Sequence, residues 1–425
     1  MPSLWPWERV LMDSRRIGRT VAYWRERRRL TQTEFGALMG KSRRWVQDLE
    51  AGARQSDPRL SVLEAAARVL SVSLAELLAD APAAVKADAS EMDLIRTTLQ
   101  QYDVVTGLPA DAHEPLDVEA LRRRVHYGWK RFQSSAAFSS IGRLVPDLLT
   151  DATRAAARHD GDDRLTAYRL LSMALQLTEA VAIKAGDTQL ASLAGHRAVI
   201  AAERAGDPVV MASAARHLAD AMTADGQPHA AAAFAVTAAE RLSPDLVGGG
   251  PAGLSVLGML YLKAAMAQAS AAGLDDRRAA DAARAVPSLL DEAAEHAAQL
   301  GGDGLNCLFT AFGPTNVKLY RLAAHVKLYE GAAGVAVAQA VTADARAALP
   351  RERRAHLLTD LAHAHMQAGA RETAVDTLLD AEREAKEEVR RRPRTHQLVE
   401  DLRLLGAGAA EGRLRALAGR CGLPG

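Results

Sequence analysis

Three glycines spaced twenty residues apart constrain the fold of this chain more than any other feature. Gly186, Gly206 and Gly226 each lie in a short turn with an aspartate beside the glycine, and Ala-rich segments with helical spacing separate them. Glycine next to aspartate is typical of the end of one helix and the start of the next. Two such steps make one helix-turn-helix repeat, so the pattern predicts a stack of helix pairs, an α-solenoid.

The composition also favours helices. Of the 425 residues, 48% are hydrophobic and only 4% are aromatic. Alanine and leucine supply much of the hydrophobic share, which favours helix over strand and predicts an all-α fold. A further helix pair is predicted late in the chain, where small and apolar residues recur at helical spacing around Gly369: Leu357, Leu361, Ala364, His365, Ala374, Leu378 and Ala381.

Several classes of protein are excluded by pattern. Met1–Arg19 lacks the apolar stretch and cleavage site of a secretion signal. Cys307 and Cys421 are the only cysteines and cannot build a disulfide framework, which fits a reducing compartment. Val247–Leu262 is uncharged, but it is short and interrupted by glycines, so it indicates a loop leading into a buried helix rather than a membrane span. The predicted location is the cytoplasm, in association with the nucleoid.

The charges are unevenly distributed along the chain. The formal net charge is +1, but the segment from Arg15 to Arg59 contains 12 basic and 5 acidic residues. Its local charge is therefore +7, which leaves −6 for the rest of the chain. A compact basic segment on a mildly acidic chain suggests a module that faces a polyanion. On charge alone, the alternative is a solvated charged face.

This basic segment also has the signals of short helices. Thr31 and Glu34 have the spacing of a capping box, and the helix that they begin ends at Gly40. Ser42 can cap the next helix, so the two helices are joined by a tight turn and form a helix-turn-helix. Five helices are predicted between residues 14 and 80, the last two beginning at the caps Asp57-Pro58 and Ser73.

The same residues resemble the Xre/phage-repressor family of DNA-binding domains over residues 15–80. The similarity depends on several spacings that agree together: Leu30-Thr31-Gln32, Gly40, Val46, Leu49-Glu50-Ala51-Gly52, Leu63 and Leu70-Ser71-Val72-Ser73. The resemblance implies that the third helix enters the major groove of double-stranded DNA. It also implies a structural ion pair between Arg25 and Glu50, which would join the first helix to the end of the third.

The candidate DNA-binding residues follow from this resemblance. They are Gln32, Lys41, Ser42, Arg43, Arg44, Trp45 and Gln47. Arg43 and Arg44 suit bidentate contact with guanine O6 and N7, or contact with phosphate. Gln32 matches a position that family members use against the DNA backbone. Trp45 stands where the family has a small or polar residue, and either contacts a thymine methyl or sugar or covers the neighbouring core.

Three regions are predicted from these patterns. Residues 1–80 form the DNA-binding domain, residues 81–115 form a linker that begins with an Ala/Asp/Pro-rich stretch, and residues 116–425 form the helical repeats. The repeats resemble tetratricopeptide (TPR) helix pairs in degenerate form. The combination of a helix-turn-helix domain with TPR-like repeats resembles a class of actinobacterial regulators. The segments Phe312–Val317 and Leu349–Arg353 resemble sequence segments that recur in that class.

No catalytic, cofactor or metal site is predicted. The segment from Gly36 to Ser42 is one residue short of a phosphate-binding loop and follows a helix, while Gly248–Gly253 matches a dinucleotide fingerprint without a preceding strand. His356, His363 and His365 have no cysteine or acidic partner at ligand spacing. Cys307 lies in an apolar run and is interpreted as a small buried hydrophobe.

The two asparagines of the chain, Asn306 and Asn316, lie ten residues apart among apolar residues. An asparagine side chain can bond a peptide backbone through both its amide and its carbonyl. With Tyr320, Arg321 and Tyr329, they form a candidate groove for a peptide or a small amphipathic effector. The alternative is a helix cap or a satisfied core amide.

Together these patterns predict a sequence-specific DNA-binding transcriptional regulator. It would bind a palindromic operator as a homodimer, because a small helix-turn-helix makes few base contacts. The TPR-like body would serve dimerisation and sensing. The alternative is a protein-interaction scaffold or an antitoxin-like protein whose DNA binding is auxiliary; no residue set supports an enzyme.

Overall fold

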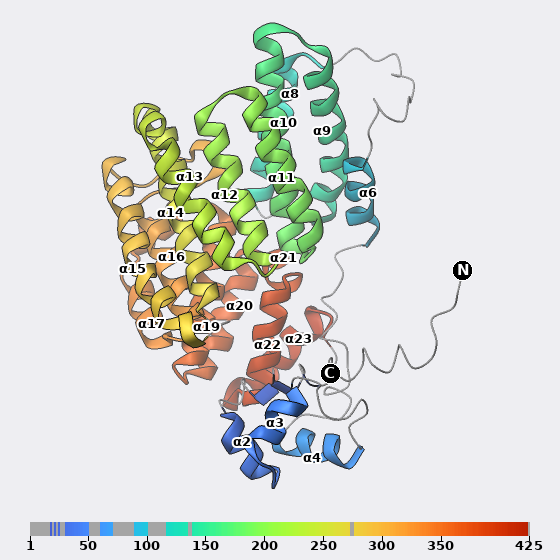
Figure 1. Ribbon diagram of the computed structural model, residues 1–425, viewed down its shortest axis with the longest axis vertical. Coiled ribbons are helices and arrows are strands. Elements are labelled where there is room, and N and C mark those ends of the chain that lie inside the picture. Colours follow the sequence, from blue (N-terminus) through green and yellow to red (C-terminus); the bar gives the residue numbers. More distant parts are fainter. Residues whose placement is uncertain are drawn as a thin grey trace, which may run out of the picture. The chain divides into compact units, whose positions relative to one another are not determined.

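The computed structural model describes residues 18, 21–22, 24–25, 30–50, 60–70, 89–100, 116–134, 138–272 and 276–423. The chain divides into two compact units, residues 1–83 and 84–425. Every regular element within the described residues is a helix, which confirms the predicted all-α class (Figure 1).

The first unit contains the predicted helix-turn-helix. Its described helices are α2 (Gln32–Leu38), α3 (Arg43–Glu50) and α4 (Leu60–Leu70). The predicted capping box is confirmed, since Glu34 N donates to Thr31 Oγ1 at 3.1 Å and Thr31 N donates to Glu34 Oε2 at 2.7 Å. After α2, Gly40 has a φ of +65°, and Lys41 N donates to Gly36 O at 2.7 Å. This left-handed turn ends α2 and begins the approach to α3.

Other parts of the predicted five-helix domain lie outside the described residues. These are the third helix beyond Glu50, the Asp57-Pro58 cap, the Ser73-capped fifth helix and the Ala/Asp/Pro-rich start of the linker.

The second unit is a longer series of helices. In chain order they are α6 (Ala89–Leu99), α8 (Val118–Gln133), α9 (Phe138–Arg158), α10 (Gly161–Ala185), α11 (Thr188–Ala205), α12 (Pro208–Ala224), α13 (Pro228–Gly248), α14 (Gly250–Ala271), α15 (Asp276–Gln299), η1 (Cys307–Phe309), α16 (Pro314–Lys327), α17 (Gly331–Gln339), α18 (Ala343–Ala348), α19 (Arg351–Gln367), α20 (Arg371–Glu384), α21 (Lys386–Arg390), α22 (Pro393–Leu405), η2 (Gly408–Ala410) and α23 (Glu411–Arg420).

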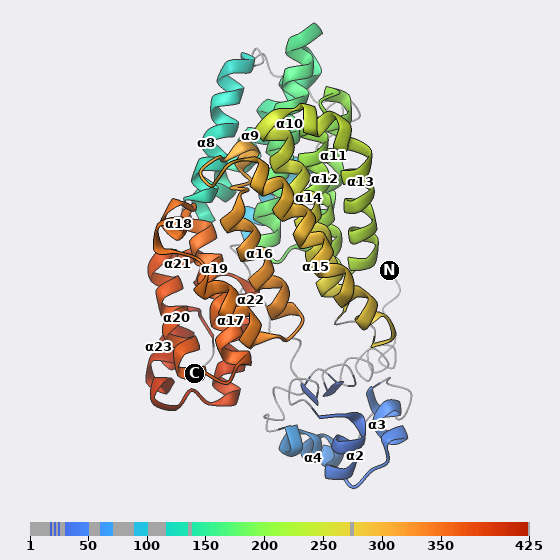
Figure 2. The same ribbon diagram turned by 90° about the vertical axis from the view of Figure 1, so that its left-hand side faces the viewer.

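Helices α8 to α16 form the stack that the glycine spacing predicts. Each packs on the next in the chain, and α8, α10, α12, α14 and α16 also pack directly on one another. The even-numbered helices therefore form one layer and the odd-numbered helices the other (Figures 1 and 2). This double set of contacts is the arrangement of a TPR-like α-solenoid.

The repeated turns have the predicted chemistry. Gly186 and Gly206 have φ values of +77° and +67° and end their helices in the left-handed region. Asp187 Oδ1 then accepts from Leu190 N at 3.0 Å, and Asp207 Oδ1 accepts from Val209 N at 2.9 Å. Each turn thus satisfies backbone groups that the two helix ends leave free.

The segment between α15 and α16 enters the interior of the second unit. The Phe309 ring stacks on Trp129 of α8, with centroids 5.2 Å apart. The Phe312 ring, fully buried, lies against Gly258 of α14, where an added Cβ would be only 2.0 Å from Phe312 Cζ. Gly258 therefore makes room for the aromatic ring.

Two helices bear on predictions about the chain's organisation. Helix α6 lies within residues 81–115, predicted as a linker, and its buried Met92, Ile95 and Leu99 belong to the same core cluster as α8 to α12.

Helix α14 is long and apolar enough to cross a membrane by length and composition, but 67% of its apolar window is buried in the protein. Its apolar character thus matches its place in the core, as the buried-helix interpretation predicts.

Candidate nucleic-acid interface

The helix-turn-helix is held together by a buried polar network. Arg25 Nε donates to Glu50 Oε1 at 2.6 Å and Arg25 Nη2 donates to Glu50 Oε2 at 3.2 Å, so the predicted partners meet in a two-point ion pair. Arg25 Nη1 also donates to Leu30 O at 2.8 Å. Gln32 Nε2 donates to Glu50 Oε2 at 2.9 Å, which ties the first turn of α2 to the end of α3.

Helix α3 has one buried and one exposed face. Val46 and Leu49 are buried in the core of the unit. The predicted contact residues on the other side are exposed: Lys41, Ser42, Arg43, Arg44 and Gln47. Ser42 Oγ accepts from Trp45 N at 3.2 Å, which confirms the predicted cap. Cations at the exposed amino-terminal end of such a helix are placed to contact a polyanion.

The guanidinium groups of Arg43 and Arg44 are available for that purpose. Among the residues that the structure describes, no carboxylate lies within ion-pair distance of either group. A structural role would instead give these arginines partners within the protein, as it does for Arg25.

Trp45 lies between the two interpretations given by the sequence. Its side chain is half-buried, and Lys41 Nζ lies 5.6 Å from its ring centre, within the range of a cation–π contact. The Trp45 side chain is therefore partly covered and lies beside the Lys41 ammonium group.

Two glycines allow the helices of this unit to approach closely. An added Cβ on Gly18 would be 2.4 Å from Leu49 O, and one on Gly36 would be 2.8 Å from Lys41 O. Both contacts are with backbone atoms, which move only with the helix or turn that contains them. Small residues at these positions thus set the orientation of α3 against the preceding helices.

The comparisons agree with this geometry. A helix-turn-helix family model matches residues 21–77, a span that contains α2, α3 and α4. This part of the chain is thus a helix-turn-helix domain of the Xre type, the class of DNA-binding domain predicted from the sequence. No curated protein matches the chain.

Among the solved structures similar to this chain is that of Bacillus thuringiensis PlcR in complex with the peptide PapR7 and DNA. The sequence identity is 12%, the match covers 68% of this chain and 98% of that chain, and the TM-score is 0.24. A TM-score this low establishes no shared arrangement of the helices.

The residues of the candidate ligand groove lie in different surroundings. Asn306 Nδ2 donates to Gln133 Oε1 at 2.7 Å and Asn306 Oδ1 accepts from Ala311 N at 2.9 Å, so this side chain holds the loop before α16. Asn316 and Tyr320 are buried, while Arg321 pairs with Asp291 at 2.8 Å. Tyr329 is 74% exposed at the end of α16. Asn306 is exposed, whereas Asn316 is buried, with Nδ2 donating to Thr310 O at 3.3 Å and Oδ1 without a hydrogen-bond partner.

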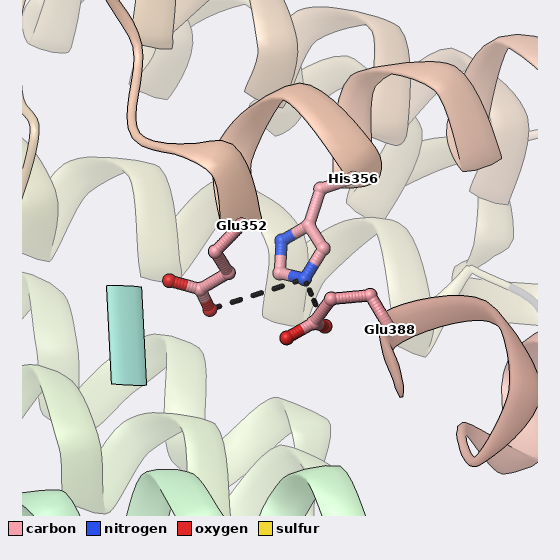
Figure 3. Close-up of side chains that lie close together, drawn as sticks. All are labelled: Glu352, His356 and Glu388. Carbon is pink, nitrogen blue, oxygen red and sulfur yellow. Dashed lines mark hydrogen bonds and ion pairs between the residues drawn. The ribbon is translucent and has the colours of Figure 1, made fainter. Parts of the chain in front are cut away.

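A cluster joins three helices of the second unit and corrects the expectation that His356 has no acidic partner at ligand spacing, since Glu352 stands four residues before it on the same helix. Glu352 and His356 of α19 and Glu388 of α21 bring their ligand atoms within 4.8 Å of one another (Figure 3). Lys184 Nζ of α10 pairs with both carboxylates, at 3.1 Å from Glu352 Oε1 and more closely with Glu388 Oε1. Arg392 Nε lies 2.9 Å from Glu388 Oε2.

The charges of this cluster are already balanced. Burial opposes ionisation, but Lys184 and Arg392 hold the pKa of Glu388 well below its ordinary value, and Lys184 likewise lowers that of Glu352. Two cations therefore occupy the surroundings that a metal ion would need. The cluster connects the carboxyl end of α10 to α19 and α21, which lie far from it in the sequence.

Proposed function

We propose that this protein is a sequence-specific DNA-binding transcriptional regulator that acts in the cytoplasm at the nucleoid. The exposed cations of α3 carry the proposal, since they stand on a helix fixed by a cap, a left-handed turn and a buried ion pair. Such a rigid support lets a few side chains read base edges in the major groove.

The operator we propose is an inverted repeat bound by a homodimer. One domain of this size presents few side chains to the bases, and two copies related by a twofold axis double the number of contacts. The TPR-like second unit would supply the dimer contacts and bind an effector that alters the placement of the two DNA-binding domains.

Selection of DNA from a random double-stranded library by the full chain tests this function. An enriched inverted repeat with half-sites about one or two helical turns apart supports a dimeric regulator. Recovery of unrelated sequences would contradict sequence-specific binding and favour the alternative, a scaffold or antitoxin-like protein with auxiliary DNA affinity. Light scattering of the free chain then reports whether the dimer exists before DNA is added.

A further inference from the structure

A continuous line of polar side chains crosses the inner layer of the second unit. Helices α10, α12, α14, α16 and α19, called the inner row below, pack one on the next. Each contributes to the line, whose members include Glu179, His217, Asp220, Lys263, Tyr320 and Arg353.

The contacts run from one end of the inner row to the other. Glu179 Oε2 of α10 lies 2.5 Å from His217 Nδ1 of α12. Asp220, one turn further along α12, pairs with Lys263 of α14. Lys263 Nζ lies 5.3 Å from the ring centre of Tyr320 in α16, and the guanidinium carbon of Arg353 in α19 lies 6.0 Å from the same ring.

In two of these contacts the partners leave no net charge. Burial alone would lower the pKa of Lys263, but Asp220 and Tyr320 together raise it above its ordinary value, so Lys263 remains charged and neutralises Asp220. Burial raises the pKa of Glu179 well above its ordinary value and lowers that of His217 well below it. Glu179 and His217 therefore form a neutral pair.

Two guanidinium groups of this line have no carboxylate paired with them. Arg216 of α12 is 3% exposed, and burial lowers its pKa to about 10, so it is still protonated at neutral pH. Arg216 Nη2 donates to the backbone oxygen of Leu308 at 3.4 Å. Burial alone would lower the pKa of Arg353, but Tyr320 and Glu352 raise it above its ordinary value. In the part of the chain that the structure describes, no carboxylate lies within ion-pair distance of Arg216 or Arg353. The Nε atoms of both are buried and have no hydrogen-bond partner. Unbalanced buried charge is costly, and an anion beside it removes that cost.

We infer that the inner row binds the anionic group, a carboxylate or a phosphate, of a small ligand. The guanidinium carbon of Arg353 lies 6.0 Å from the ring centre of Tyr320, and Tyr320 raises the pKa of both Arg216 and Arg353, so the anion would lie beside that residue. His217 Nε2, buried without a partner, offers one further polar atom. A planar guanidinium can form two parallel hydrogen bonds with either anion. The side chain of Asp220 is 34% exposed, so this region reaches solvent.

This inference gives a chemical class to the effector of the proposed function, and it can fail separately from DNA binding. It concerns residues of the second unit alone and predicts binding in the absence of DNA. The nearby cluster of Lys184, Glu352 and Glu388 provides a contrast, because its buried cations are already paired with carboxylates.

Calorimetric titration of the full chain with inorganic phosphate, and separately with succinate, tests the inference at constant ionic strength. Arg353→Gln and Arg216→Gln each remove one unpaired charge and are expected to weaken binding about tenfold or more, the loss of one charge-assisted hydrogen bond. Arg241→Gln is the matched control, since Arg241 is exposed on α13. Circular dichroism checks that each variant is folded.

The two probes distinguish the sources of the anion. Tighter binding of phosphate indicates a phosphorylated ligand, and tighter binding of succinate indicates a carboxylic acid. The absence of binding heat with both probes would overturn the inference. Equal affinities in wild type, Arg353→Gln and Arg241→Gln would overturn it as well. If Arg216→Gln does not fold, the comparison of Arg353→Gln with Arg241→Gln decides, because Arg353 is only half-buried.

Discussion

Arg25 and Glu50 meet across the first unit in an ion pair whose side chains are each 9% exposed. Two nitrogens of the guanidinium bond the two carboxylate oxygens, and Gln32 bonds one of these oxygens as well. The end of α3 is therefore fixed to the helical segment that contains Arg25 and to the start of α2. The orientation of the exposed arginines depends on this contact.

Removing one partner of this pair is expected to destabilise the first unit strongly. Arg25→Ala or Glu50→Ala leaves a buried charge unpaired, at a cost of about 3–5 kcal/mol, and the double variant should recover part of that loss. Hydrogen exchange of the α2 and α3 amides measures the local stability. Additive losses in the double variant would contradict direct coupling.

Arg43→Ala and Arg44→Ala are expected to weaken binding to the selected operator by about 1–3 kcal/mol each if the arginine reads a base. Fluorescence anisotropy on the operator and on scrambled DNA separates two roles. A loss on the operator alone indicates base contact, whereas equal losses on both indicate phosphate contact. Arg68→Ala, on the exposed side of α4, is the control. No loss for either α3 variant would remove this helix from the interface.

Gly258→Ala is expected to destabilise the second unit by about 1–3 kcal/mol, because the added methyl overlaps the buried Phe312 ring. Gly412→Ala is the matched control. It lies within α23, where an added Cβ meets nothing within 4 Å, and alanine there should stabilise the helix by up to about 1 kcal/mol. Thermal unfolding measures both. Equal effects of the two changes would show that Phe312 does not occupy this space.

The stability of the second unit is expected to fall as the pH decreases below 6.5. Burial, with Arg394 nearby, lowers the pKa of His363 to about 3, whereas a histidine of the unfolded chain titrates near its ordinary value of 6.5. Between these values only the unfolded chain binds the proton, so the slope from this group approaches about 1.4 kcal/mol per pH unit. Denaturant unfolding at a series of pH values should show that the unfolding free energy of His363→Gln depends less steeply on pH than that of the wild type. The exposed His229→Gln should leave the slope unchanged; identical slopes for all three proteins would contradict a buried neutral His363.

Local chemistry made much of the fold predictable. The capping box of Thr31 and Glu34, the Ser42 cap and the aspartates after Gly186 and Gly206 depend on residues within a few positions of one another. Such contacts are encoded in short stretches of sequence. The ion pair of Arg25 and Glu50 is not local and came from the family resemblance.

The contacts that shape the second unit's interior were not predictable in this way. Lys184 and Glu388 are 204 residues apart, and Gln133 and Asn306 are 173 apart. Their meeting depends on how the solenoid curves, which no helical periodicity specifies. The unpartnered Nε atoms of Arg216 and Arg353 likewise become visible only once five helices are placed side by side.

The specificity ratio of the full chain tests the central claim most directly. Competition anisotropy at a fixed salt concentration compares the affinity of the chain for the selected inverted repeat with its affinity for a scrambled duplex. Repeating the measurement at a series of salt concentrations gives the electrostatic contribution to each affinity. A regulator is expected to prefer its operator by about a thousandfold or more, with affinity for both duplexes falling steeply as salt rises. Equal affinity for the two duplexes at every salt concentration would contradict sequence-specific regulation by this protein.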